Sequence, residues 1–161
     1  MKIIFFRHAK TELNAKTGKD FDRGLRDNGI RQCTVMNDFI EKEFSGVNFF
    51  VLCSTAKRTR QTYKRAFDGI QSQVKYLDDL YLASAAEILK IIQHENIPDD
   101  VQLVILGHNE GLTDLVNYLT DANCYVQTSG WVEITFDVDD LQLLSRGLGT
   151  IARYYRPVLG A

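Results

Sequence analysis

Residues 2–9 read KIIFFRHA, and residues 101–109 read VQLVILGHN. Each stretch is a short run of mainly apolar side chains followed closely by a histidine. Such a run predicts a strand that is buried on both faces, as the strands of parallel sheets are. Because parallel strands bring their carboxyl ends to one edge of a sheet, we expect His8 and His108 to lie near each other.

The rest of the chain alternates short apolar runs with segments of helical periodicity. Further strands are expected at 49–53, 74–77, 131–136 and 150–155. Helices are expected at 29–44, from a Ser54 cap to about Phe67, from a Ser84–Glu87 capping box onward, from Asn109 onward and briefly near Leu141. This alternation predicts an α/β fold, a three-layer α/β/α sandwich around a mostly parallel sheet.

Composition narrows the class of protein. The chain has 161 residues, with 19 Lys and Arg against 21 Asp and Glu, for a net charge of −2. We therefore expect one domain over residues 1–161, with neither nucleic acid nor a membrane as partner. The first strand begins too early for a signal peptide, which favours a cytoplasmic protein. The odd, scattered cysteines Cys33, Cys53 and Cys124 are expected to be reduced thiols.

Polar side chains follow three of the expected strands: Arg7 with His8, Ser54 with Arg58, and Gly107 with His108. A single histidine at a strand end is usually structural, but two in the same setting favour a shared site. His94 lies at the polar end of a helix and is expected to be solvated. The polar, aperiodic stretch 9–28 is a long loop, and such loops in compact domains are usually functional.

Four segments resemble motifs of the histidine phosphatase (phosphoglycerate mutase-like) superfamily. Residues 6–10, FRHAK, resemble its R-H-G/A signature, residues 54–62, STAKRTRQT, its S-P-x-x-R-x-x-Q-T motif, and residues 107–109, GHN, its G-H-x motif. Residues 20–25, DFDRGL, resemble the D-x-D-R-x-L segment of the short SixA-like phosphohistidine phosphatases. Ala9 replaces the commoner Gly and Thr55 the commoner Pro. The resemblance spans about residues 2–136.

The resemblance implies a metal-independent phosphatase without a cofactor, in which His8 is the nucleophile and forms a phosphohistidine intermediate. Its other implied site residues are Arg7, Arg58 and His108, with Arg23 as a further phosphate-binding group. Arginine forks match phosphate oxygens, and their positive charge is expected to lower the pKa of His8 and keep its imidazole neutral. The basic residues around Arg58 are expected to form a solvated face: Lys57, Arg60, Lys64 and Arg65.

The short link between residues 77 and 84 leaves no room for the large helical lid of bigger relatives. An open pocket favours a protein substrate, so the preferred reaction removes phosphate from phosphohistidine of a partner, such as a histidine phosphotransfer domain, and releases inorganic phosphate. The alternatives are a broad small-molecule phosphomonoesterase and a non-catalytic module that reads phosphate. The general acid stays open among five carboxyl groups: Asp20, Asp22, Asp78, Asp79 and Glu87.

Overall fold

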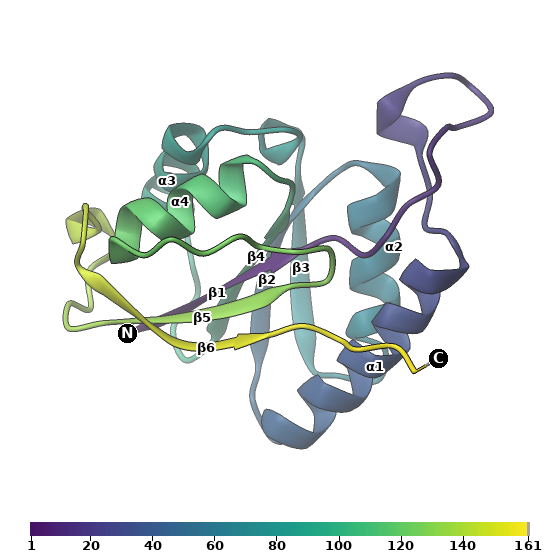
Figure 1. Ribbon diagram of the computed structural model, residues 1–161. Coiled ribbons are helices and arrows are strands. Elements are labelled where there is room, and N and C mark those ends of the chain that lie inside the picture. The colour runs from purple at the N-terminus through teal and green to yellow at the C-terminus, as the bar shows by residue number, and fades with distance from the viewer. Residues whose placement is uncertain (161) are drawn as a thin grey trace.

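A computed structural model describes residues 1–160 and contains a six-stranded sheet between two layers of helices (Figure 1). The strands are β1 (Lys2–Arg7), β2 (Phe49–Ser54), β3 (Ser72–Leu77), β4 (Gln102–Gly107), β5 (Trp131–Phe136) and β6 (Gly149–Tyr155). Their order is β3-β2-β4-β1-β5-β6, and the first four run parallel. β5 is antiparallel to both of its neighbours. The predicted, mostly parallel sheet is confirmed.

The helices cover both faces of this sheet. They are α1 (Asp27–Glu43), α2 (Lys57–Ala66), α3 (Ala85–His94) and α4 (Gly111–Thr120), with 3₁₀ turns η1 (Asp20–Asp22), η2 (Asp78–Leu80) and η3 (Leu141–Leu143). Helices α1 and α2 pack on one face, and α3 and α4 pack on the other. The three-layer architecture is confirmed, and the link from β3 to α3 carries only the η2 turn.

The apolar run of β1 is explained by its central place in the sheet. Ile3 and Phe5 point into the core beneath α3 and α4, while Ile4 and Phe6 point into the core beneath α1 and α2. All four side chains are fully buried. Each such burial contributes about 1.5–3 kcal/mol relative to exposure, so both faces of this strand must be apolar.

The register of β1 on β4 sets the geometry of the site. Arg7 pairs with Gly107, so His8 and His108 leave neighbouring parallel strands at the same level. The backbone N–H of His8 donates to the carbonyl of Gly107 across a distance of 3.2 Å. The expected meeting of the two histidines at the carboxyl edge of the sheet is therefore confirmed.

Two expected helix starts are wrong. Ser54 is the last residue of β2 and does not cap α2, whose N-cap is Ala56. The hydroxyl of Ser54 instead accepts the N–H of Ala56 and lies 2.8 Å from Nε2 of His108. Helix α4 begins at Gly111 rather than Asn109, and a Cβ at Gly111 would lie only 1.9 Å from a backbone carbonyl oxygen. The capping box of Ser84 and Glu87 is confirmed.

The remaining composition-based expectations concern thiols and surface charge. Cys33 and Cys53 are buried and Cys124 is half-buried, and all three are free, as predicted. Burial raises the pKa of the Cys33 thiol to about 12, which keeps it protonated and unreactive. The basic residues predicted to form a solvated face are exposed: Lys57, Arg60, Lys64 and Arg65. Within residues 1–160, the helices are too short or too polar to span a membrane.

Candidate active site

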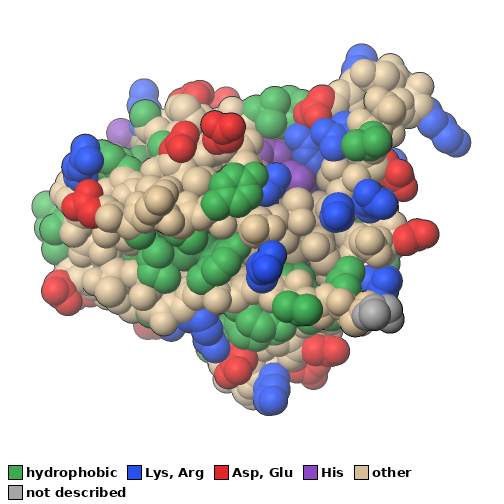
Figure 2. Space-filling view, in the orientation of Figure 1, with side chains coloured by type: hydrophobic (Ala, Val, Ile, Leu, Met, Phe, Trp, Pro, Cys, Tyr) green, Lys and Arg blue, Asp and Glu red, His purple; other side chains and the backbone are tan. Residues whose placement is uncertain are grey.

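Two histidine rings lie side by side at the carboxyl edge of the sheet. The ring centroids of His8 and His108 are 5.3 Å apart, and their side chains are 7% and 2% exposed. Figure 2 shows histidine side chains in a recess beside Lys and Arg side chains, between the main body and the loop that projects at the upper right. This projecting loop comprises residues 9–26 (Figure 1).

The hydrogen bond of His8 defines which of its ring nitrogens is free. Nδ1 lies 2.7 Å from the carbonyl oxygen of Ala9, and because a carbonyl only accepts, Nδ1 carries the proton. Nε2 of the neutral ring then keeps its lone pair. Burial lowers the pKa of His8 well below its usual value, and His108, Arg58 and Arg7 lower it further, against the bond to Ala9. The ring is thus neutral near pH 7 and can act as a nucleophile.

Thr62 of α2 holds Ala9, the residue whose carbonyl orients His8. Its Oγ1 accepts the backbone N–H of Ala9 at 3.0 Å and donates to the carbonyl of Arg58 at 2.7 Å. Both Thr62 and Ala9 are fully buried. The sequence contains Thr62 within a quoted motif, but periodicity and spacing assign it no role. Only the tertiary structure shows that it connects α2 to the backbone beside the nucleophile.

The two ring nitrogens of His108 differ in their hydrogen bonding. Nε2 lies 2.8 Å from the Ser54 hydroxyl, whereas Nδ1 is buried without a hydrogen bond among the described residues. Burial lowers the pKa of His108 to about 3, and Arg58 and Arg7 act in the same direction, against Asp20. If the Ser54 hydroxyl donates to Nε2, the Nδ1 proton is free to be donated to an oxyanion.

The two arginines nearest the histidines differ in how their donors are used. Arg58 is 3% exposed, which confirms that it points inward, and it donates to the backbone and carboxylate oxygens of Asp20 at 2.8 and 2.9 Å. Arg7 donates from Nη1 to the carbonyl of Val126 at 3.0 Å, and its buried Nε has no partner among the described residues. Unpaired buried donors of this kind suit a bound anion.

Arg23 does not face the histidine pair directly. It donates to the carbonyl of Glu12, to Oδ1 of Asp20 and to Oγ1 of Thr11, and all three acceptors belong to the projecting loop. Asp20 thus links Arg23 to Arg58. Its predicted phosphate-binding role stays a prediction.

Carboxyl groups near the site are already engaged. Oδ2 of Asp20 accepts from Arg58 and from the hydroxyl of Tyr81, whose ring packs edge-on against His108. Partial burial acts to raise the pKa of Asp20, but hydrogen bonds from Tyr81, Arg23 and Arg58 hold it well below its usual value. Hydrogen bonds to Ser84 lower the pKa of the exposed Glu87. Neither carboxyl is thus suited to be a general acid near pH 7.

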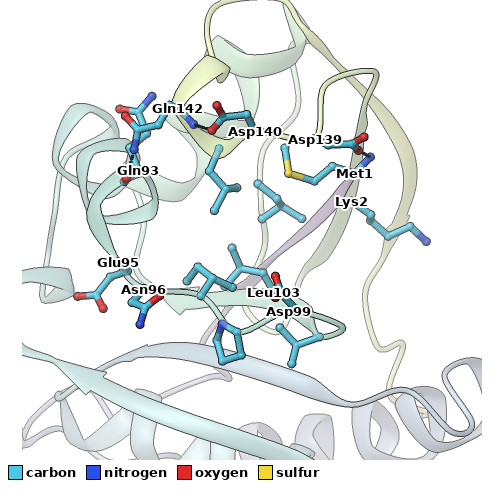
Figure 3. A pocket seen from close by; sticks show the side chains of 15 residues that line it. Met1, Lys2, Gln93, Glu95, Asn96, Asp99, Leu103, Asp139, Asp140 and Gln142 are labelled. Atoms are coloured by element: carbon cyan, nitrogen blue, oxygen red, sulfur yellow. Dashed lines mark hydrogen bonds and ion pairs between the residues drawn. The ribbon is translucent and has the colours of Figure 1, made fainter.

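A second hollow lies at the opposite edge of the sheet, where β1 and β4 begin. It measures about 530 Å³ and is shown in Figure 3. Asp139 pairs with the N-terminal amine in this hollow, and Glu95, Asp99 and Asp140 also line it. Negative side chains repel phosphate, so this hollow does not suit the same ligand. Among residues 1–160, no group of three or more His, Cys, Asp or Glu side chains is arranged to hold a metal ion.

Comparison with known proteins finds similarity to one family model and to one curated relative. The model of the histidine phosphatase superfamily (branch 1) matches residues 3–81. An uncharacterised protein of Mycobacterium tuberculosis is 34% identical over 103 residues, which cover 63% of this chain and 61% of that protein. The chain thus matches about three-fifths of the length of this curated relative.

Solved structures share the fold along nearly the whole chain. A putative phosphohistidine phosphatase SixA from Nakamurella multipartitia has a TM-score of 0.82 at 24% identity, covering 99% of this chain and 98% of that one. The protein histidine phosphatase SixA complexed with tungstate has a TM-score of 0.78 at 20% identity, covering 97% of each chain. These findings show that the chain has the fold of SixA structures and that its first half is similar in sequence to the histidine phosphatase superfamily (branch 1).

Proposed function

We propose that this protein is a phosphatase that removes the phosphoryl group from phosphohistidine of a partner protein, with His8 as the nucleophile. The observation that carries the proposal is the environment of His8. Its ring is buried and neutral, its Nδ1 proton is held by Ala9, and its Nε2 keeps a lone pair beside His108 and two arginines. The similarity in fold to SixA structures supports the same substrate class.

The reaction proceeds in two transfers. Nε2 of His8 attacks phosphorus while the P–N bond to the substrate histidine breaks, and the departing imidazole takes up a proton. Water then attacks phosphorus, the P–N bond to His8 breaks, and the water proton is released as inorganic phosphate leaves. Arg7, Arg58 and the Nδ1 proton of His108 stabilise the charge on the equatorial oxygens. The guanidinium groups supply the positive charge throughout.

The state of the carboxyl groups supports phosphohistidine over an alkyl phosphate. An alkoxide leaving group needs a nearby acid, and the lowered pKa values of Asp20 and Glu87 make both poor donors. The free ring nitrogen of a substrate phosphohistidine can take a proton from solvent near neutral pH, because the pKa of an imidazole is about 6.5, and the ring then departs as neutral imidazole. This proton demand suits a site in which neither Asp20 nor Glu87 serves as an acid.

The test is a substrate panel with wild type, His8→Ala and His94→Ala. His94 is the matched control because it is exposed at the end of α3, away from the site. We expect wild type and His94→Ala to dephosphorylate a phosphorylated histidine phosphotransfer domain faster than p-nitrophenyl phosphate and to trap ³²P. We expect His8→Ala to do neither.

The other outcomes identify the alternatives. Faster turnover of simple esters than of the phosphoprotein would point to a broad phosphomonoesterase. Tight binding of the phosphoprotein without trapped label in the wild type would point to a module that reads phosphate. Label trapped equally by His8→Ala would remove His8 from the nucleophile's role.

A further inference from the structure

The carboxylate of Asp20 occupies the fork of Arg58 in the ligand-free protein. Arg58 donates from Nη1 to the backbone carbonyl and from Nη2 to Oδ2 of this one residue. Arg23 binds the other oxygen, Oδ1, at 2.9 Å, and the Tyr81 hydroxyl donates to Oδ2 at 2.5 Å. A planar carboxylate held by two guanidinium groups and a hydroxyl is bound as an anion ligand would be.

This carboxylate belongs to the site rather than to a separate surface pair. Arg58 is almost fully buried, and the charge of Asp20 raises the pKa of His108, whereas the charges of Arg58 and Arg7 lower it. The η1 turn that carries Asp20 contacts α2, which carries Arg58. Asp20 therefore lies within the field that an incoming phosphoryl group meets.

We propose that Asp20 is a positioning residue that acts as an internal counter-anion, and that the phosphoryl group of the substrate replaces its carboxylate on Arg58. With both histidines neutral, Arg7, Arg58 and Arg23 supply three positive charges and Asp20 removes one. The remaining two balance a phosphoryl dianion. Asp20 keeps Arg58 extended and paired while the site is empty, and it weakens the hold on inorganic phosphate, which eases product release.

The exchange needs only a local movement. Asp20 retains its bonds to Arg23 and Tyr81 if Arg58 turns to the phosphoryl oxygens, so the carboxylate keeps a positively charged partner. The η1 turn lies within the projecting loop, whose base is fixed by the bond from Arg26 N–H to the Lys10 carbonyl. The part of the loop that carries Asp20 can therefore shift while its two ends stay in place.

The experiment measures equilibrium binding of inorganic phosphate and of tungstate by calorimetry, so it requires no turnover. The variant is Asp20→Asn, which preserves shape and removes the charge. The matched control is Asp22→Asn, because Asp22 lies in the same turn and its carboxylate accepts only from Thr17 among the described residues. Removing one charge at the rim of the site should lower the Kd for phosphate about five- to tenfold. Asp22→Asn should stay within about twofold of the wild type.

A purely structural role predicts the opposite result. If Asp20 only held Arg58 in shape, Asp20→Asn would bind phosphate more weakly, and that result, or unchanged binding, overturns the proposal. A crystal structure of the wild type with bound tungstate gives a second test should Asp20→Asn fail to fold. Arg58 should leave Oδ2 of Asp20 for the tungstate oxygens, and an Arg58–Asp20 bond retained beside bound tungstate would overturn the proposal.

The proposal rests on the proposed function for its choice of ligand, but the two fail separately. Tighter phosphate binding in Asp20→Asn without phosphatase activity in the wild type would preserve the counter-anion and reject the enzyme. Wild-type activity on phosphohistidine, with no gain in phosphate binding in Asp20→Asn, would preserve the enzyme and reject the counter-anion.

Discussion

Replacing Thr62 with valine tests whether the bond between α2 and the Ala9 peptide supports both the fold and the nucleophile. The change keeps the branched shape of a fully buried side chain and replaces its hydroxyl with a methyl group, which removes the bonds to the Ala9 N–H and to the Arg58 carbonyl. The Ala9 N–H then loses its acceptor at 3.0 Å in a region closed to water. A buried donor without a partner costs about 1–3 kcal/mol.

The loss of stability is measurable by urea and thermal unfolding. For a chain of this length, 2 kcal/mol lowers the melting temperature by about 4–8 °C. Thr34→Val is the matched control, because Thr34 is exposed on α1 and, among residues 1–160, donates only to the carbonyl of Ile30 in its own helix. We expect the control to stay within about 0.5 kcal/mol of the wild type.

The same change should slow turnover of p-nitrophenyl phosphate. The Ala9 carbonyl holds Nδ1 of His8, so a shift of Ala9 misplaces the attacking Nε2. We expect kcat to fall about tenfold or more, with KM changed less because the arginines remain. If Thr62→Val unfolds like the wild type, the Ala9 bond contributes nothing to stability. If kcat is also unchanged, the link from α2 to His8 is irrelevant to catalysis.

Two further outcomes follow from the buried charges. Folding lowers the pKa of both His8 and His108, so the unfolded chain binds more protons than the folded chain below about pH 6.5. The free energy of unfolding should therefore fall by roughly 2 kcal/mol for each histidine between pH 7 and 5. A free energy of unfolding in urea that stays constant across that range would contradict the neutral buried rings. Glu133 is 1% exposed and accepts hydrogen bonds from Lys2, Arg153 and Trp131. Glu133→Gln should lower the free energy of unfolding by about 1–3 kcal/mol and leave kcat unaltered. A melting temperature equal to that of the wild type would show that its ion pairs are replaceable.

Sequence periodicity predicts the parts of this molecule that repeat. The unbroken apolar run of β1 requires burial on two faces, and that requirement alone leads to a sheet between helices and to paired strand ends. The motif resemblance adds that Arg58 points inward, although its neighbours Lys57 and Arg60 do not. These features depend on local spacing, which a single sequence records.

Contacts between distant polar residues cannot be predicted in this way. The Ser54 hydroxyl resembles a helix cap in sequence but lies beside His108, 54 positions away. Asp20 lies in a loop without periodicity, and its partner Arg58 is 38 positions distant. Such pairs depend on the path of the backbone after folding. The sequence alone therefore leaves Asp20 as one of several candidates for the general acid and predicts no role for Thr62.

The pairing of β1 with β4 fixes the spacing of the two histidines independently of the projecting loop. His8 and His108 extend from strands whose backbones are bonded to each other up to the His8 N–H and the Gly107 carbonyl, so their spacing is as fixed as the sheet itself. Asp20 and Arg23 instead lie on a loop that contributes no strand to that sheet. The rest of this loop can therefore change in sequence without altering the spacing of the two histidines, provided that Asp20 still reaches Arg58.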